Sequence, residues 1–421
     1  MKALAEFFLY FSLVILSCLT AGCTSEVDII GGTPETPENP QANDPNRRSV
    51  VISLQNKLIL VNGTPESRAI TRDGIAEEDE NRIESFDIYA FGSDKEEGPY
   101  TFQEHFAYRS DAGTLPTGAS PIDLKADEAA GKINVVFYPR KGLFTKFYCV
   151  ANQTEMNDAA GNIYTNYTPL QQSSQTQSGV PGDIVTSPGT PTESDFIKLN
   201  TPLLNPTGFN ANILLAPLPM SGANSQPTDL REYSMGTYVR LNVSLTRAVA
   251  RFDIVNDATK SHFTITDISM GNGRQGVTLF PIRPTGDVPA TNGQLITYPY
   301  RLFDGLNANA GTTTKAFYCY PCKAIDAGFL ILKGLYTMNL TDEKKEVSYR
   351  IPFERVTDGN GTRIEINHNH RYTVQITEAD PFELTANIRL VDWETGDYID
   401  DYEPDNGLET IAVADLLPVG E

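Results

Sequence analysis

Apolar residues recur at alternate positions along most of this chain, and this period of two predicts β-strands. The alternating runs are rich in Val, Ile, Tyr, Phe and Thr, and Gly, Pro, Asn and Asp separate them. Strands are expected at 83–91, 133–138, 146–151, 238–245, 248–255, 264–268, 315–320, 328–338, 346–351, 371–376 and 386–391. Helical spacing is convincing nowhere, although short helices around 123–130 or 154–160 would fit. Many short strands between turn residues predict an all-β fold made of sandwiches.

The run between residues 50 and 62 has a clear alternation, with apolar residues at nearly every even position. One face of this strand should therefore be buried in a sheet. The apolar side chains on that face are Val50, Ile52, Leu54, Leu58 and Leu60. Burying them is worth about 10 kcal/mol before the entropy of ordering the strand. Loss of the strand would expose an apolar groove and an unpaired edge.

Two stretches without strands divide the chain. Residues 23–48 are rich in Gly, Pro, Asn and Glu and predict a flexible tether, and the low-complexity residues 171–206 predict a long surface excursion. We place a domain boundary near residue 240. The predicted organisation is a signal peptide at 1–22, the tether at 23–48, a removable strand at 49–68, sandwich domains at 69–240 and 241–396, and a tail at 397–421.

The apolar run at residues 7–19 is typical of a cleaved export signal, because a membrane-spanning helix takes ~20 apolar residues. Ala21 and Gly22 directly before Cys23 match a bacterial lipobox. Cys23 is therefore predicted to carry a fatty acid such as palmitate and to become the N-terminus of a lipoprotein. Cys18 is a poorer second candidate, and an ordinary secretory signal is the alternative.

Charge and cysteine content narrow the function. The chain has 33 Lys and Arg against 54 Asp and Glu, a net charge of −21, which argues against nucleic acid because phosphates need a basic surface. This charge favours a soluble, self-repelling surface that suits dense display. Outside the signal region the cysteines are Cys149, Cys319 and Cys322, an odd number. A disulfide scaffold is therefore not expected, and stability must come from burial.

Two short motifs resemble metal or redox sites. Cys319-Tyr320-Pro321-Cys322 has suitable spacing, but it ends a predicted strand, and no second cysteine pair follows. We interpret it as two strand-end cysteines, with a disulfide between them left open. His368-Asn369-His370 would give half of a metal site, but a turn before the next strand is the favoured interpretation.

No nucleophile elbow, phosphate loop or His-Glu-x-x-His motif occurs. Carboxylate pairs such as Glu77-Glu78 and Asp400-Asp401 lie in polar loops and are predicted to be solvated surface. Trp393, the only tryptophan, is predicted to anchor the core, with a sugar-binding platform as the alternative. We therefore expect a non-enzymatic chain without catalytic residues, metal or cofactor.

Several weak motifs follow one another in an order that resembles the Bacteroidales-type fimbrillins, the lipoprotein-derived subunits of type V pili. The N-terminal part supplies a lipobox, a short strand, an arginine before a small residue and an acidic stretch. The motifs are Ser67-Arg68-Ala69, Glu77-Glu78-Asp79-Glu80, Phe147-Tyr148-Cys149-Val150-Ala151-Asn152, the Arg-x-x-Ala-Arg-Phe strand ending at Phe252, Ala316-Phe317-Tyr318-Cys319-Tyr320-Pro321, Asn369-His370-Arg371-Tyr372-Thr373-Val374-Gln375-Ile376 and Ile388-Arg389-Leu390-Val391-Asp392-Trp393. The resemblance covers essentially the whole chain.

The resemblance implies two tandem transthyretin-like, Greek-key β-sandwich domains and a lipidated precursor at the cell outer membrane. A trypsin-like, Arg-specific protease would cut between Arg68 and Ala69, leaving 353 of the 421 residues. Arg72 is an alternative cut, and a cut at Arg47-Arg48 fits poorly because it leaves the strand in place. After the cut the strand departs, and its groove accepts a strand from another copy or a related fimbrial subunit.

The resemblance also implies a donor strand in the C-terminal tail. Ile411, Val413, Leu417 and Val419 share one face of an extended segment, which Asp415 interrupts. A segment that caps only its own domain would have the same pattern.

The predicted function is therefore a structural subunit, placed in the shaft, of an extracellular fimbrium that supports adhesion. A tip or anchor subunit and a non-polymerising, glycan-binding surface lipoprotein are the alternatives. A β-sandwich hydrolase has no motif in its favour.

Overall fold

In the computed structural model, β-strands make up most of the described chain, with a few short helical turns between them. The structure describes residues 41, 44–54, 59–60, 77–111, 114–127, 132–158, 163–164, 192–207, 211–224, 226–231, 237–280, 291–303, 310–338, 343–357, 360–393 and 409–411.

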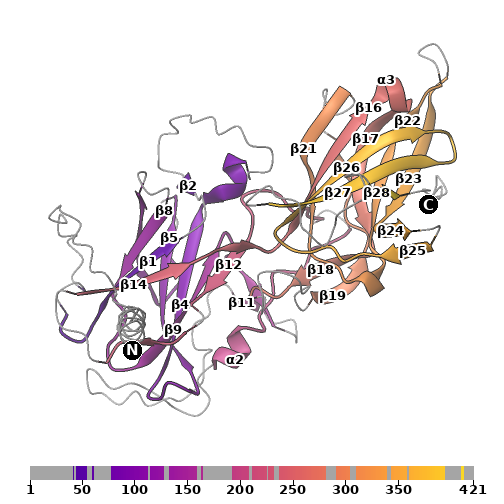
Figure 1. The fold of residues 1–421 in the computed structure, drawn as a ribbon. Helices are drawn as coiled ribbons and strands as arrows, with labels where there is room; N and C mark the ends of the chain where they lie inside the picture. The colour runs from indigo at the N-terminus through magenta and orange to yellow at the C-terminus, as the bar shows by residue number, and fades with distance from the viewer. Residues whose placement is uncertain are drawn as a thin grey trace, which may run out of the picture. The chain divides into compact units, whose positions relative to one another are not determined.

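The first sandwich consists of two sheets that share an apolar core (Figure 1). One sheet contains, in order, β14 (Tyr238–Val243), β1 (Ser49–Leu54), β8 (Lys132–Phe137) and β7 (Asp123–Asp127). The other contains β15 (Thr246–Arg247), β12 (Met220–Ala223), β9 (Phe144–Ala151), β4 (Ser85–Ser93), β5 (Thr101–Arg109) and β6 (Ala119–Pro121), with β13 (Thr228–Asp229) paired to β9. Ile52 from one sheet and Phe86 and Phe147 from the other meet in this core.

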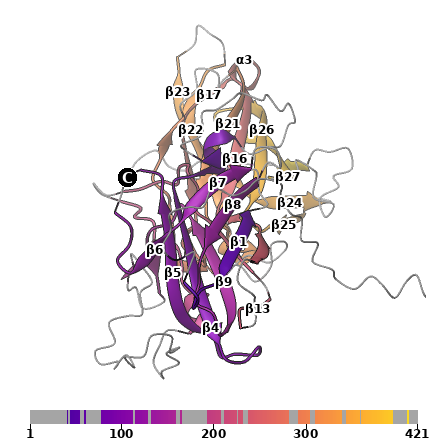
Figure 2. The same ribbon diagram turned by 90° about the vertical axis from the view of Figure 1, so that its left-hand side faces the viewer.

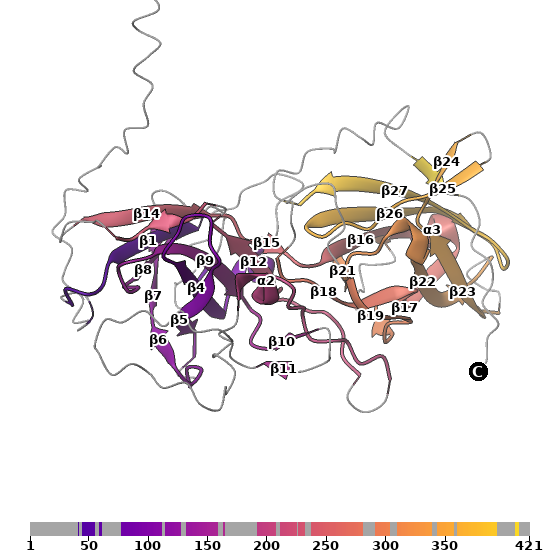
Figure 3. The same ribbon diagram turned by 90° about the horizontal axis from the view of Figure 1, so that it is seen from below.

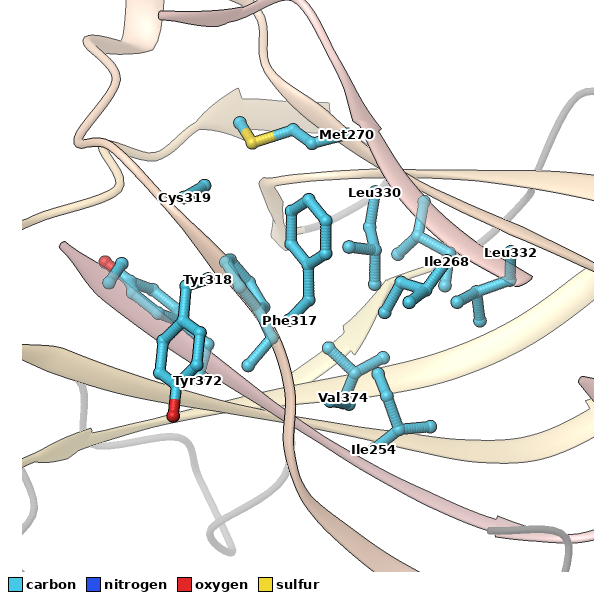
Figure 4. Packing of buried hydrophobic residues seen from close by; sticks show 14 of the residues in the cluster. Ile254, Ile268, Met270, Phe317, Tyr318, Cys319, Leu330, Leu332, Tyr372 and Val374 are labelled. Carbon is cyan, nitrogen blue, oxygen red and sulfur yellow. The ribbon is translucent and has the colours of Figure 1, made fainter. Parts of the chain in front are cut away.

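The second sandwich has the same two-layer construction. Its larger sheet contains, in order, β21 (Ala310–Cys319), β16 (Ala250–Asp257), β26 (His370–Ala379), β27 (Leu384–Asp392) and β28 (Glu409–Ile411). The other contains β20 (Arg301–Leu302), β17 (Phe263–Gly271), β22 (Phe329–Tyr336) and β23 (Lys345–Pro352). In Figure 4, side chains such as Ile254 and Val374 lie near Leu330 and Leu332 inside this core.

Short strand pairs and helical turns complete the described fold. The pairs are β2 (Ile59–Leu60) with β3 (Arg82–Ile83), β10 (Met156–Asn157) with β11 (Ile163–Tyr164), β18 (Gly273–Val277) with β19 (Thr291–Ile296), and β24 (Glu354–Thr357) with β25 (Asn360–Arg363). The helical turns are η2 (Glu78–Asn81), α2 (Glu193–Phe196), α3 (Ala258–Ser261) and η3 (Ala324–Asp326). Phe196 of α2 packs with Tyr89 and Phe91 in a second apolar cluster beside β4, so β4 is buried along its whole length.

The first strand of each sandwich has the same kind of neighbours. β1 is parallel to β14 and antiparallel to β8, and β16 is parallel to β26 and antiparallel to β21. The chain changes from the first pair of sheets to the second between Arg247 and Ala250, and residue 240 falls inside β14. In both sandwiches, the first strand is therefore an interior strand of its sheet.

The predicted all-β sandwich fold is confirmed, and the suggested helices are wrong. Residues Asp123–Asp127 form β7, in which Leu124 is buried and Asp123 and Lys125 are exposed, the alternation of a strand paired to β8. Met156–Asn157 form β10, paired to β11. A short segment has no stable helical preference of its own, so the neighbouring strands decided its conformation.

Candidate functional site

The strand β1 lies between β14 and β8, as Figure 3 shows, and Figure 2 gives β1 and β8 from another direction. Ile52 is level with Leu241 on β14 and with Val135 on β8. The ladder covers all of Ser49–Leu54 on the β14 side and Val50–Leu54 on the β8 side. Both backbone edges of β1 are therefore paired, unlike those of an edge strand.

The even-numbered side chains of β1 are fully buried, as predicted. Val50, Ile52 and Leu54 are each 0% exposed and belong to the core of the first sandwich. At ~1.5–3 kcal/mol each, their burial contributes about 7 kcal/mol before the entropy cost. Leu58 and the side chain of Leu60 lie outside the described residues, so the prediction is confirmed for these three side chains.

The opposite face of β1 is also covered. Val51 is buried, and Ser53 Oγ donates a hydrogen bond of 2.6 Å to Asn134 Oδ1 on β8. Just before the strand, Arg47 Nη1 lies 2.8 Å from Glu104 Oε1, and the Arg48 N–H donates to the Pro139 carbonyl. The start of β1 is therefore tied to the sandwich by polar contacts as well.

The predicted processing residues Cys23, Arg68 and Ala69, and the alternative Arg72, lie outside the described residues. On either side of this gap, β2 pairs in parallel with β3, level at Ile59 with Arg82. The chain before the predicted cut therefore contacts the chain after it.

The acidic stretch forms a short helical turn, η2, and we call Glu77–Asn81 the acidic segment. Glu78 is exposed, as predicted, but Glu80 is completely buried and Glu77 is half-buried. The prediction of solvated surface for the pair Glu77-Glu78 is therefore right for Glu78 and wrong for Glu77, and the burial of Glu80 was not predicted. Asp400-Asp401, predicted in the same way, lies outside the described residues.

Glu80 is buried because cationic and hydroxyl groups of the second sandwich surround it. Arg251 Nη1 on β16 donates to Glu80 Oε2 at 2.7 Å, and Tyr318 OH on β21 donates to Glu80 Oε1 at 2.6 Å. Arg251 Nε also donates to Asp253 Oδ1 at 2.7 Å. Burial lowers the pKa of Arg251, but the charges of Asp253 and Glu80 more than offset this and raise it above its ordinary value. Arg251 therefore stays ionised, held between two buried carboxylates.

Lys315 on β21 binds the outer side of the same segment. Its Nζ lies 2.7 Å from Glu77 Oε2 and 2.9 Å from Asp79 Oδ2. Burial raises the pKa of Glu77, but the hydrogen bonds and charges around it, chiefly from Lys315, lower it overall. Lys315 therefore adds partly exposed ion pairs to the buried Arg251–Glu80 pair.

Arg247 on β15 holds the end of the acidic segment. Its Nη2 donates to Asn81 Oδ1 and its Nη1 donates to Asn369 Oδ1 at 3.1 Å. The guanidinium lies 4.9 Å from the ring centroid of Trp393, which is fully buried and stacked with Tyr318. The prediction of Trp393 as a core anchor is confirmed, and the sugar-platform alternative is wrong.

We call Arg247, Arg251, Lys315 and Tyr318 together the arginine site. This site was not predicted from the sequence, although most of its residues belong to the separate motifs described above. One signal was available: Arg251 and Asp253 alternate with Ala250, Phe252 and Ile254 inside a strongly apolar strand. Charges at such positions are buried only when they are paired, so they predicted a compensating partner.

The three body cysteines are buried and free. Burial raises the pKa of the Cys322 thiol to about 12, and that of Cys319 also lies well above its ordinary value because of burial. Cys319 ends β21, as the strand-end interpretation predicted. These thiols are poor nucleophiles, because the reactive form is the thiolate.

His368 and His370 lie at the turn that opens β26, as expected. His370 Nδ1 contacts the carbonyl oxygen of His368 at 2.7 Å. Burial, and then the charge of His370, lower the pKa of His368 to about 4. Within the described ranges, no group of three or more His, Cys, Asp and Glu side chains is placed to hold a metal ion.

Two open hollows adjoin Arg109, with volumes of about 450 and 380 Å³. Arg109 Nη1 and Nη2 donate to the buried carboxylate of Asp87 at 3.0 and 3.1 Å, and His105 Nε2 lies 2.8 Å from Asp87 Oδ1. The guanidinium is therefore already engaged in a structural network.

The predicted donor residues are described only at Ile411. This residue lies in β28, level with Ala386 on the neighbouring β27. Val413, Leu417 and Val419 lie outside the described residues. The start of the tail therefore pairs with the edge of its own sheet.

Among the helices that the structure describes, none has the length and apolarity needed to cross a membrane. No family model matches the chain, and no curated protein matches it.

Several solved structures are similar to this chain, and they include fimbrial proteins. The tip fimbrial protein Mfa3 from Porphyromonas gingivalis with C-terminal truncation has a TM-score of 0.45 and 15% identity, covering 82% of this chain and 100% of that one. A fimbrial assembly protein from Parabacteroides distasonis has a TM-score of 0.43 and 12% identity, covering 87% and 98%. The fimbrial anchor protein Mfa2 from Porphyromonas gingivalis has a TM-score of 0.30 and 10% identity, covering 84% and 100%. The expected resemblance to fimbrial proteins is thus confirmed.

Proposed function

We propose that this chain is a non-enzymatic structural subunit of a cell-surface fimbrium. It is secreted as a lipoprotein precursor, acylated at Cys23 and delivered to the cell outer membrane. An Arg-specific, trypsin-like protease cuts after Arg68, the strand β1 is lost, and a strand from another copy or a related subunit takes its place. The tail with Ile411, Val413, Leu417 and Val419 is the proposed donor, and shaft growth by such exchange supports adhesion.

The observation that carries this proposal is the position of β1. It precedes the proposed cut, yet it is an interior strand with three fully buried side chains. Its removal would leave β14 and β8 about 10 Å apart, which is twice the spacing of neighbouring strands. Both facing edges would then be unpaired, and the apolar core between them would be open to water. Such a state calls for another strand of matching alternation.

The first experiment digests the purified precursor with an Arg-specific protease. We expect a new N-terminus at Ala69, read by N-terminal sequencing, and oligomers in size-exclusion chromatography with light scattering. The double variant Arg68→Lys, Arg72→Lys should stay uncut between the strand and Glu77 and monomeric, whereas the matched control Arg72→Lys alone should behave as the wild type. A product that starts at Ala69 and remains strictly monomeric would refute assembly by strand exchange.

A peptide spanning residues 49–62 separates strand exchange from other kinds of aggregation. Added in excess to freshly cut protein, it should refill the groove and suppress oligomers. The same peptide with Ile52→Asp should not, because it would bury a charge without a partner. Equal suppression of oligomers by both peptides would contradict the claim that the peptide acts by refilling the groove left by β1.

The pairing of β28 with β27 favours a second candidate. A tail that pairs with a strand of its own sandwich is what a tip or anchor subunit, or a glycan-binding lipoprotein that does not polymerise, would have. For this candidate, deletion of residues 409–421 should destabilise the second sandwich of the monomer. For the shaft subunit, the same deletion should abolish assembly and leave the monomer stable.

A further inference from the structure

We propose that the arginine site is a binding site for the acidic segment that stays occupied through maturation and thereby protects the bond between Arg82 and Ile83. The ligand class is an acidic peptide, supplied by the chain's own residues Glu77–Asn81. The inference rests on the proposed function only in assuming a protease that cuts after arginine. If the processed chain begins at Ala69, as proposed, the inference also explains why it is not cut again after Arg82.

The charge balance of the second sandwich depends on this segment. Arg251 has a side chain only 2% exposed, and its buried carboxylate partners are Glu80 and Asp253. Asp253 is shared, because its Oδ1 also accepts a hydrogen bond from the backbone N–H of Lys315 and its Oδ2 lies 3.9 Å from Arg371 Nε. Release of the segment would thus leave two cations beside one buried carboxylate, a costly state at low dielectric.

The hydroxyl group of Tyr318 and the ammonium group of Lys315 also bind the segment. Tyr318 OH donates to Glu80 Oε1, and Lys315 Nζ pairs with both Glu77 and Asp79. Within the segment, the Glu77 N–H donates to Glu80 Oε2 at 2.7 Å, which closes the helical turn. Loss of β1 removes none of these contacts, because all of them lie after the proposed cut.

The chain directly after the segment pairs with β2, which would leave with β1, and it is otherwise held by groups that lie after the proposed cut. Asn152 Nδ2 donates to the Arg82 carbonyl at 2.7 Å, and Asn152 Oδ1 accepts the Glu84 N–H at 2.8 Å. Ile83 is 0% exposed, although the Arg82 guanidinium itself is partly exposed. A protease must bind several residues in an exposed, extended form, so a cut here requires local opening.

The test is digestion of the full precursor with an Arg-specific protease, with the N-terminus at Ile83 counted by mass spectrometry. Glu80→Gln keeps the size of the side chain but removes the charge that faces Arg251. We expect it to speed cleavage after Arg82 at least ~30-fold, because cleavage follows the population of the opened segment. Glu78→Gln is the matched control: it loses the same charge from the same turn, but at an exposed residue, and should behave as the wild type.

Hydrogen exchange at residues 77–83 gives a second readout of the opening of the segment. Lys315→Met is a milder variant, because the ion pairs that it removes are partly exposed. Lys315→Met should give an intermediate acceleration, so the inference stays testable if Glu80→Gln fails to fold. Wild-type protein processed to Ile83, or equal cleavage rates after Arg82 in all three variants, would overturn the inference. A cut at Arg72 instead of Arg68, or failure to assemble, would count against the proposed function only.

Discussion

Replacing Ile52 with Ala tests whether β1 is a core strand that maturation removes. Ile52 is completely buried between β14 and β8, level with Leu241 and Val135. Truncating such a side chain costs about 3 kcal/mol, the transfer term plus the cavity left behind. A cost of this size lowers the ratio of folded to unfolded first sandwich on the order of 100-fold.

The assay is hydrogen exchange of the intact precursor, followed on peptides from β8 and β14. We expect their protection to fall on the order of 100-fold in Ile52→Ala. Val374→Ala is the control, because it opens a similar cavity in the core of the second sandwich. Trp393, the only tryptophan, is buried in the second sandwich, so Val374→Ala should change its fluorescence. The hydrogen exchange of β8 and β14 should stay unchanged in this control.

Processing provides the decisive comparison. If the chain is cut after Arg68, the wild type and Ile52→Ala yield processed proteins of identical sequence, so all differences in stability and assembly must vanish. A difference that persists after processing would refute removal of the strand. Unchanged protection in the uncut variant would refute the position of β1 in the core.

Three further predictions concern the remaining buried groups. His368, whose pKa is lowered to about 4, is buried neutral, so the unfolded chain binds its proton first. Stability should therefore fall by about 3 kcal/mol as the pH drops from about 6.5 to about 4, and melting curves of His368→Gln should lack this loss. Gly334→Ala should destabilise the second sandwich by about 2 kcal/mol in urea unfolding, because a Cβ there overlaps the carbonyl oxygen of Thr264. The three buried thiols of the body should react with a thiol reagent at pH ~8 only after unfolding, and rapid labelling of native protein would contradict their burial.

Strand positions were predictable because their signal is local. The runs expected at 328–338 and 371–376 became β22 (Phe329–Tyr336) and β26 (His370–Ala379). The alternation of Val50, Ile52 and Leu54 also identified the buried face of β1. Such periodicity follows from the geometry of one strand, whatever its neighbours are.

The arginine site was not predictable in the same way, because its members come from distant parts of the chain. Glu80 and Arg251 are 171 positions apart, and Glu80 and Tyr318 are 238 positions apart. The pair Glu77-Glu78 was predicted to be solvated surface, because the charge of a residue does not show whether folding brings a group of opposite charge next to it. A polar sequence therefore predicts exposure reliably only where the fold has no buried group of opposite charge that pairs with it.

The sequence by itself predicted the β-strand fold that the described residues have, and it identified an amphipathic strand before Arg68. The export signal at residues 1–22 lies outside the described residues and stays a prediction. Only the tertiary structure decided that this strand lies in the interior of a sheet and that the acidic segment is buried against Arg251. The physical reason is that side-chain alternation is a property of a single strand. Edge pairing and charge compensation are instead properties of groups that only folding brings together.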